Sequence, residues 1–169
     1  GENILVADVS LVSSADSAVE IEGASKVRFE RVSVESNGTA FNILNSKDVW
    51  IENADIAAAE IGLKLVNAKR LSLTGCALAR AKKGVFFAGG NTESSLSANC
   101  FKLCETGLFA SSGDTSLTIC ENAFNNCTAA GVVLDGAKRV VVKTNSFADF
   151  SGSATPIRAA ASYSIIADN

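Results

Sequence analysis

The tripeptide Asn-x-Phe occurs three times in this chain at a constant interval. It reads Asn99-Cys100-Phe101, Asn122-Ala123-Phe124 and Asn145-Ser146-Phe147, and each copy begins 23 residues after the one before. A period of roughly 20 to 50 residues is typical of proteins built from stacked repeats. We therefore expect a chain of repeating units, in which each unit buries its apolar face against its neighbours.

The same period extends beyond the three copies of the tripeptide. Successive repeats open at Gly62, Gly84, Gly107 and Gly131, which are 22 to 24 residues apart. Residues 1–17 form a degenerate first repeat, and a partial last repeat begins near Ala154. The spacing predicts about seven repeats in a single domain over residues 1–169. The chain lacks methionine and starts directly in strand-like sequence, so we expect a fragment of a larger protein.

Each repeat contains three short segments in which apolar and polar residues alternate, separated by Gly, Asn, Ser, Asp and Lys. Alternation is the period of a β-strand with one buried face, and the separating residues favour turns. No helical pattern lies between the segments, so each repeat is expected to form one coil of a solenoid. Each strand then pairs in parallel with its counterpart in the next coil, about 4.8 Å away.

This register predicts columns of residues that point into the core. Three columns are apolar at nearly every position: Val19, Phe41, Leu63, Val85, Leu108 and Val132; Val27, Val49, Leu71, Ser94, Leu117, Val140 and Tyr163; and Val34, Ile56, Leu78, Phe101, Phe124 and Phe147. A fourth inward column contains Asn37, Ala59, Ala81, Cys104, Cys127 and Phe150. The register therefore predicts that the three phenylalanines of the repeated tripeptide stack on one another inside the coil.

The asparagines of the tripeptide form a column of their own, two residues before the stacked phenylalanines. A buried side-chain amide needs partners, and it carries both a donor and an acceptor. Asn99, Asn122 and Asn145 are therefore expected to form a ladder that bonds to the turn backbone. Three asparagines lining a polar ligand site are the less favoured interpretation.

These features resemble the right-handed parallel β-helix repeat family, which has the pectate-lyase-like superfold. The matching features are the coil length, the asparagine ladder, the phenylalanine stack and the glycine that opens each coil. The resemblance implies an all-β fold: a right-handed parallel β-helix solenoid of about seven coils of 22–24 residues, with three strands per coil. It does not imply one function, because related folds serve polysaccharide lyases, hydrolases, esterases and epimerases, as well as tailspikes, adhesins and intracellular interaction domains.

Composition excludes several classes of function. The net charge is −3, which gives no reason to expect nucleic acid or an anionic membrane as a partner. No apolar run is long enough to span a membrane. The five cysteines cannot all pair within the chain. Although Cys104 and Cys127 are close enough in the predicted register for a disulfide, we expect free, mostly buried thiols, as in a reducing, cytoplasmic compartment.

The sequence offers little for catalysis. It contains no histidine, and nothing in it implies a metal or a cofactor. Glu30 and Glu52 fall in one outward column beside Arg28 and Asp48, where a carboxylate pair could bind a cation or act as acid and base. A solvated face of mixed charge is the simpler interpretation. The short turns leave no cleft in which to exclude water, so no catalytic residue is predicted.

A second group of charged residues, Asp135 and Arg158, also has a structural explanation. Asp135 is followed one coil later by Arg158, and we expect a cross-strand ion pair between them.

An outward apolar strip is the most informative surface feature. Phe86, Phe109 and Val133 are predicted to lie side by side in three consecutive coils, with Leu44 and Val66 beside them and Trp50 outward on the second strand of its coil. Contiguous exposed apolar patches usually mark interfaces. The segment Val85-Phe86-Phe87 is apolar throughout, so a one-residue slip of the face assignment remains an alternative.

Two functional hypotheses follow. The first is a non-catalytic interaction or scaffold domain that binds a protein partner, or a second copy of itself, through the apolar strip. The alternative is a polysaccharide-binding or polysaccharide-degrading β-helix domain, with a sugar stacked on the aromatic rings.

Overall fold

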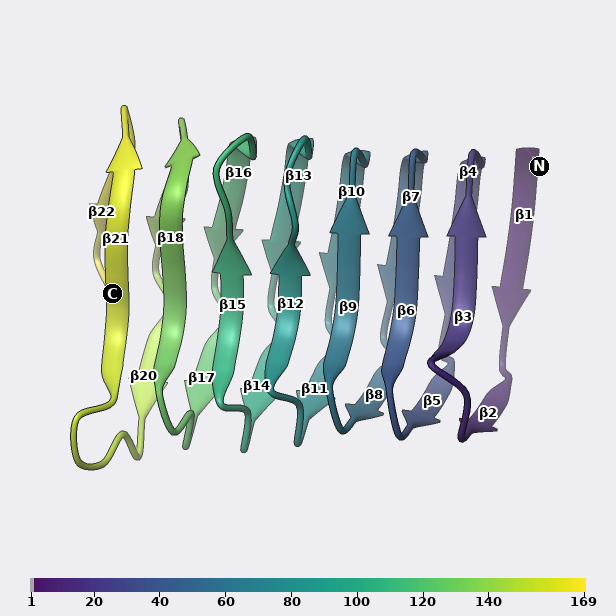
Figure 1. Cartoon of the computed structure of the whole chain (residues 1–169), viewed down its shortest axis with the longest axis horizontal. Helices are drawn as coiled ribbons and strands as arrows, with labels where there is room; N and C mark the ends of the chain where they lie inside the picture. The colour runs from purple at the N-terminus through teal and green to yellow at the C-terminus, as the bar shows by residue number, and fades with distance from the viewer. Residues whose placement is uncertain (1) are drawn as a thin grey trace.

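The computed structural model describes residues 2–169, and in that range the chain forms β-strands and turns without a helix. The strands stack along one axis as a row of coils, with the N-terminal strand at one end and the C-terminal strand at the other (Figure 1). Every strand pairing is parallel, and each coil contributes three strands. The predicted fold is confirmed: the chain is a right-handed parallel β-solenoid of about seven coils.

The strands form three faces, which we number in chain order within a coil. The first face contains β3 (Ser17–Glu22), β6 (Thr39–Leu44), β9 (Ile61–Val66), β12 (Lys83–Phe87), β15 (Thr106–Ala110), β18 (Ala130–Lys138) and β21 (Thr155–Ser162). The second contains β1 (Glu2–Ala7), β4 (Ser25–Glu30), β7 (Lys47–Glu52), β10 (Lys69–Thr74), β13 (Thr92–Ser97), β16 (Thr115–Cys120), β19 (Val141–Lys143) and β22 (Ile165–Ala167). The third contains β2 (Ser10–Ser13), β5 (Ser33–Ser36), β8 (Asp55–Ala58), β11 (Ala77–Ala79), β14 (Cys100–Lys102), β17 (Ala123–Asn125) and β20 (Ser146–Ala148).

Stacked phenylalanines fill the core next to the third face. The Phe101 and Phe124 rings lie 4.6 Å apart at 7°, and the Phe124 and Phe147 rings lie 5.1 Å apart at 8°. An alanine at Gly107 would place its Cβ 2.5 Å from Cδ1 of Phe124 and 2.7 Å from the carbonyl oxygen of Gly131. Coils therefore open with glycine at this position because the stacked ring and the next coil leave no room for a side chain.

The asparagine ladder lies in the turn between the second and third faces. Asn99 Nδ2 donates to Asn122 Oδ1 at 2.9 Å, and Asn122 Nδ2 donates to Asn145 Oδ1 at 3.0 Å. The same oxygens accept backbone N–H groups, and the amide nitrogens also donate to backbone carbonyls. Asn169 adds a further rung beyond Asn145. The ladder thus pairs buried turn groups that would otherwise lack partners.

A second polar ladder lies in the turn between the first and second faces, and the sequence analysis missed it. Asp114 is fully buried, and its Oδ1 accepts Asn91 Nδ2 at 2.8 Å and the Asn91 backbone N–H at 3.0 Å. Its Oδ2 accepts the Ser111 N–H at 2.8 Å. These bonds hold the longer turns that contain Gly89-Gly90 and Gly113. Both oxygens of the Asp114 side chain are therefore engaged in hydrogen bonds within these turns.

Three details of the predicted register are wrong. Tyr163 is 88% exposed, because Ser164 is the residue that faces Val140, to whose N–H its Oγ is bonded. Tyr163 occupies an outward bulge with φ 54°. Asn37 and Ala59 are also exposed, because the strands there are one residue longer and place Ser36 and Ala58 inward. These errors occur where the coil length changes by one residue.

Removing one rung of the asparagine ladder should destabilise the fold strongly. Replacing Asn122 by alanine leaves the amide of Asn99 and the carbonyl of Leu96 without their bonds to this side chain. An unpaired buried polar group costs about 1–3 kcal/mol, so we expect a loss of about 3 kcal/mol in the free energy of unfolding, measured by urea denaturation. Asn125→Ala, at a half-buried position three residues later at the end of β17, is the control and should cost much less. Equal losses in both variants would contradict the role of the ladder.

Candidate functional site

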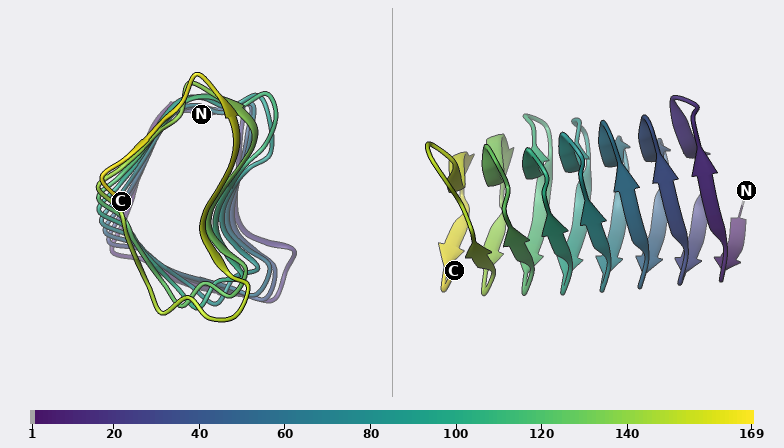
Figure 2. Two further views of the ribbon diagram at one scale, coloured as in Figure 1. Left: turned by 90° about the vertical axis from the view of Figure 1, so that its left-hand side faces the viewer. Right: turned by 90° about the horizontal axis from the view of Figure 1, so that it is seen from below.

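The first face of the solenoid is concave. Seen along the axis, the outline of the coils curves inward on the side formed by β3, β6, β9, β12, β15, β18 and β21 (Figure 2, left). The register places one outward column along this face: Glu20, Asn42, Lys64, Phe86, Phe109, Val133 and Arg158. The concave face therefore combines polar residues at its ends with aromatic residues at its centre.

Two aromatic rings occupy the centre of the concave face. Phe86 and Phe109 are half-buried, with ring centroids 5.6 Å apart and planes at 82°, an edge-to-face contact. The Lys83 ammonium lies 4.1 Å from the Phe86 ring centroid and 5.2 Å from that of Phe109. The neighbouring Val85 and Phe87 are fully buried, so Phe86 points outward. The sequence alone did not decide which residues of this apolar segment face outward.

The apolar strip differs in extent from the predicted one. Val133 points outward but is only 2% exposed, so it supports Phe109 and Arg158 rather than offering a contact surface. Outward side chains on a concave sheet converge and cover one another. Leu44 and Val66 are half-buried on the same face, whereas Trp50 lies on the second face and is not part of the strip.

Polar groups without partners lie beside the rings. Within residues 2–169, Lys64 and Lys83 form no ion pair with a carboxylate, whereas Lys69 and Lys82 do. The Oδ1 atom of Asn42, next to Lys64 in the outward column, is buried and has no hydrogen-bond partner. Buried polar atoms are nearly always paired, so this oxygen is an unsatisfied acceptor within residues 2–169.

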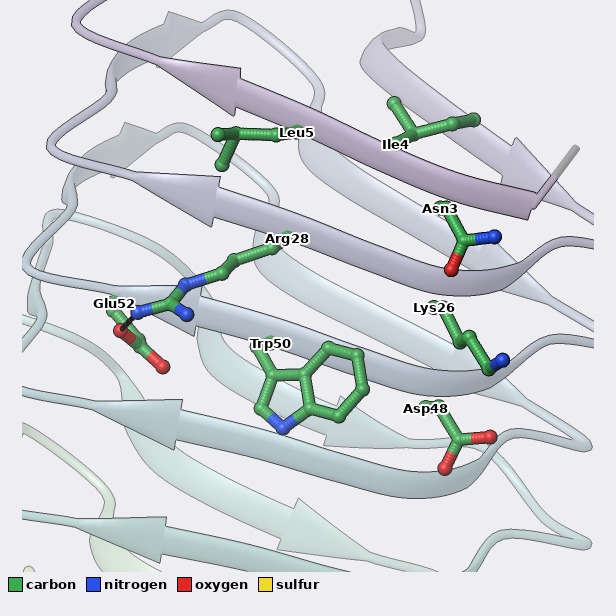
Figure 3. A pocket seen from close by; sticks show the side chains of 8 residues that line it. All are labelled: Asn3, Ile4, Leu5, Lys26, Arg28, Asp48, Trp50 and Glu52. Atoms are coloured by element: carbon green, nitrogen blue, oxygen red, sulfur yellow. Dashed lines mark hydrogen bonds and ion pairs between the residues drawn. The ribbon is translucent and has the colours of Figure 1, made fainter.

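The second face carries a shallow hollow around Trp50, although the short turns predicted a surface without clefts. Its volume is about 540 Å³, and it is lined by Asn3, Ile4, Leu5, Lys26, Arg28, Asp48, Trp50 and Glu52 (Figure 3). Arg28 donates to Glu52 at 2.7 Å, and Arg70 donates to both oxygens of Asp48 at 2.6 and 2.8 Å. Arg28, Glu52 and Asp48 are therefore held in place by cross-strand pairs.

The acidic pair Glu30 and Glu52 is neutralised by arginines. The two residues face each other on β4 and β7, as their outward column requires. Glu52 lies 2.7 Å from Arg28, and Glu30 lies 3.0 Å from Arg31. With each carboxylate engaged by a guanidinium, this geometry matches a surface of mixed charge.

Asp135 and Arg158 do not form the predicted ion pair. Arg158 lies beside Val133, and Asp135 lies beside Ala160. The two charged residues are therefore diagonal rather than directly opposite on the sheet. Diagonal neighbours lie farther apart than directly opposite ones, and no ion pair joins these two side chains within residues 2–169.

The described part of the chain contains no cluster of three or more metal-ligating side chains. No helix within residues 2–169 is long and apolar enough to cross a bilayer.

All five cysteines are free thiols, including the stacked neighbours Cys104 and Cys127. Burial raises the pKa of the Cys76 thiol to about 11 and that of Cys127 to about 12, and it also raises the pKa of Cys104. These three thiols therefore stay protonated at neutral pH, and the thiolate is the reactive form. They are core residues rather than nucleophiles.

Alkylation should distinguish the buried thiols from the others. At pH 8, iodoacetamide should modify Cys100 and Cys120, which are half-buried, and spare Cys76, Cys104 and Cys127 until the protein is unfolded. Peptide mass spectrometry after a timed reaction measures the extent at each site. Rapid modification of Cys127 in the folded protein would contradict the assignment of its raised pKa to burial.

The coil geometry, the parallel register and the asparagine ladder define a parallel β-helix protein. The family described as "Right handed beta helix region" matches residues 1–169, and the chain belongs to this family. No curated protein sequence matches the chain.

Solved structures with the same fold include enzymes and adhesins. The mannuronan C-5 epimerase AlgE4 A-module of Azotobacter vinelandii matches with a TM-score of 0.66 and 12% identity, over 98% of this chain and 58% of that one. DFA-IIIase of Arthrobacter chlorophenolicus A6 in complex with GF2 matches with a TM-score of 0.61 and 13% identity, over 90% of this chain and 53% of that one. PfbA, a surface protein and adhesin of Streptococcus pneumoniae, matches with a TM-score of 0.58 and 10% identity, over 94% of this chain and 67% of that one.

The chain spans less than two thirds of the length of the first two of these structures. At these identities the likeness establishes the fold alone.

Proposed function

We propose that this chain is a non-catalytic interaction domain that binds a partner protein, or a second copy of itself, on its concave first face. The observation that carries the proposal is the half-buried pair Phe86 and Phe109 at the centre of that face. Aromatic residues in a partly enclosed apolar setting are the usual anchors of protein interfaces.

The groups around the rings define the chemistry of the partner. Lys64 and Lys83 are cations without a carboxylate partner, so they favour an acidic surface. The best match is therefore a surface that packs an apolar side chain against the exposed parts of the two rings and surrounds it with carboxylates.

Catalysis is the weaker proposal for these residues. The neighbouring carboxylates Glu30 and Glu52 lie on the second face and are bound by Arg31 and Arg28. A general acid or base requires a proton-transfer group that is free to reach a substrate.

A polysaccharide-binding or polysaccharide-degrading role is the second candidate. The exposed edges of two adjacent phenylalanine rings can stack on a sugar. Among the structural neighbours, one is named as a mannuronan epimerase and another is seen in complex with GF2, which gives this alternative its support. A sugar on the first face would use the same rings, so one set of variants tests both ligands.

Site-specific crosslinking tests the concave face directly. A photoreactive amino acid at Val66, beside the rings, should capture a discrete partner in cells, whereas the same residue at Thr118 on the second face should not. The affinity of the captured protein is then measured with purified components. Phe86→Asp combined with Phe109→Asp should weaken binding at least tenfold, because it places two carboxylates in an apolar contact.

The controls separate loss of binding from loss of fold. Thr118→Asp adds a carboxylate on the second face and should leave the affinity unchanged. Circular dichroism checks that the double variant folds, and Lys83→Glu provides a milder variant on the first face. Sedimentation analysis of the purified chain detects self-association. Unchanged partner affinity and unchanged oligomeric state in the double variant would sink the proposal.

A further inference from the structure

Trp50 is the sole tryptophan of the chain, and it lies in the hollow of the second face. It is half-buried, and its strand neighbours are Arg28 on β4 and Ser72 on β10. One edge of the hollow is apolar, because Leu5 on β1 is 62% exposed. The hollow is open to solvent on one side and of a size typical of small-molecule sites.

Polar groups flank the indole on both sides. Figure 3 shows the Arg28–Glu52 pair on one side of the ring and Lys26 with Asp48 on the other. Asp48 is fixed by its two hydrogen bonds to Arg70, whose guanidinium lowers the pKa of the Asp48 carboxyl. Asp48 therefore stays ionised near neutral pH, and the carboxylates of Asp48 and Glu52 each retain lone pairs that can accept further hydrogen bonds.

The indole of Trp50 and the charged groups beside it together limit the class of ligand that can bind in the hollow. A wholly apolar molecule would leave half of its surface in water, because the hollow covers only one side of it. A purely ionic ligand would not use the indole. A pyranose ring has an apolar face of C–H groups and a rim of hydroxyl groups, so it matches an aromatic platform with planar polar groups at its edges.

We propose that the second face carries a sugar-binding site in which a pyranose ring of a glycan stacks on Trp50. The sugar hydroxyl groups donate to the carboxylates of Asp48 and Glu52, and Lys26 and Arg28 donate to ring or hydroxyl oxygens. The carboxylates are already held by arginines, so little side-chain entropy is lost on binding. This site does not depend on the function proposed for the first face, because Trp50 and Phe86 project from different faces.

The sole tryptophan makes the site directly measurable. The purified chain is titrated with cellotetraose, xylotetraose, tetragalacturonate and tetramannuronate while the tryptophan emission is recorded. At least one of these probes should give a saturable change in intensity or wavelength. Isothermal calorimetry with the same sugar should give the same affinity, and Trp50→Ala should weaken it at least tenfold. Trp50→Phe, which keeps an aromatic ring, should retain part of the binding.

Two controls decide how the result is interpreted. Tyr163→Ala removes a ring that is 88% exposed on the same face but lies outside this hollow, and it should leave sugar binding unchanged. Adenosine monophosphate serves as a probe for a stacked nucleobase. The proposal is overturned if no sugar of the panel binds, if Trp50→Ala binds as tightly as the parent chain, or if only the nucleotide produces a saturable change.

Discussion

In-register stacking is the constraint on which the rest of this structure depends. Each side chain lies against its counterpart in the next coil, so a column favours groups that tolerate their own kind, groups that alternate in charge, or like charges that a neighbouring column neutralises, as arginines do for Glu30 and Glu52. Phenylalanines and asparagines satisfy the first condition, because a ring can stack on a ring and an amide carries both a donor and an acceptor. Charged columns satisfy the second, as in the alternating series Lys26, Asp48, Arg70 and Glu93 on the second face.

The first face departs from this rule, and the departure locates the candidate interface. Lys64 is stacked between Asn42 and Phe86, and Lys83 between Ile61 and Thr106, so neither has a carboxylate directly next to it in its own column. The ammonium of Lys83 instead lies over the aromatic rings. The ion pairs of the second face satisfy charges within the chain, whereas Lys64 and Lys83 form no ion pair within residues 2–169 and can still pair with an external carboxylate.

The sequence predicted the inward columns well, because burial and alternation are local properties and the repeated Asn-x-Phe sets their phase. The sequence did not predict the features whose geometry depends on more than one coil. Val133 points outward as expected, but the curvature of the face buries it. Trp50 was correctly placed outward on the second strand of its coil, but the hollow around it was missed because the short turns gave no sign of a depression on that face. The burial of Asp114 was missed because the Gly89-Gly90 insertion gave no sign that the turn folds over a carboxylate.

The two candidate surfaces are fixed relative to each other by one continuous core. Trp50 lies on β7 and Phe86 on β12, and the coils between them are joined by backbone hydrogen bonds and fully buried side chains such as Leu63 and Leu71. Allosteric coupling requires two alternative arrangements that ligands can bias, and a close-packed core of this kind offers one. Binding on one face should therefore leave affinity on the other unchanged. A glycosylated partner that reaches both faces would gain affinity through its effective concentration, not through a change in shape.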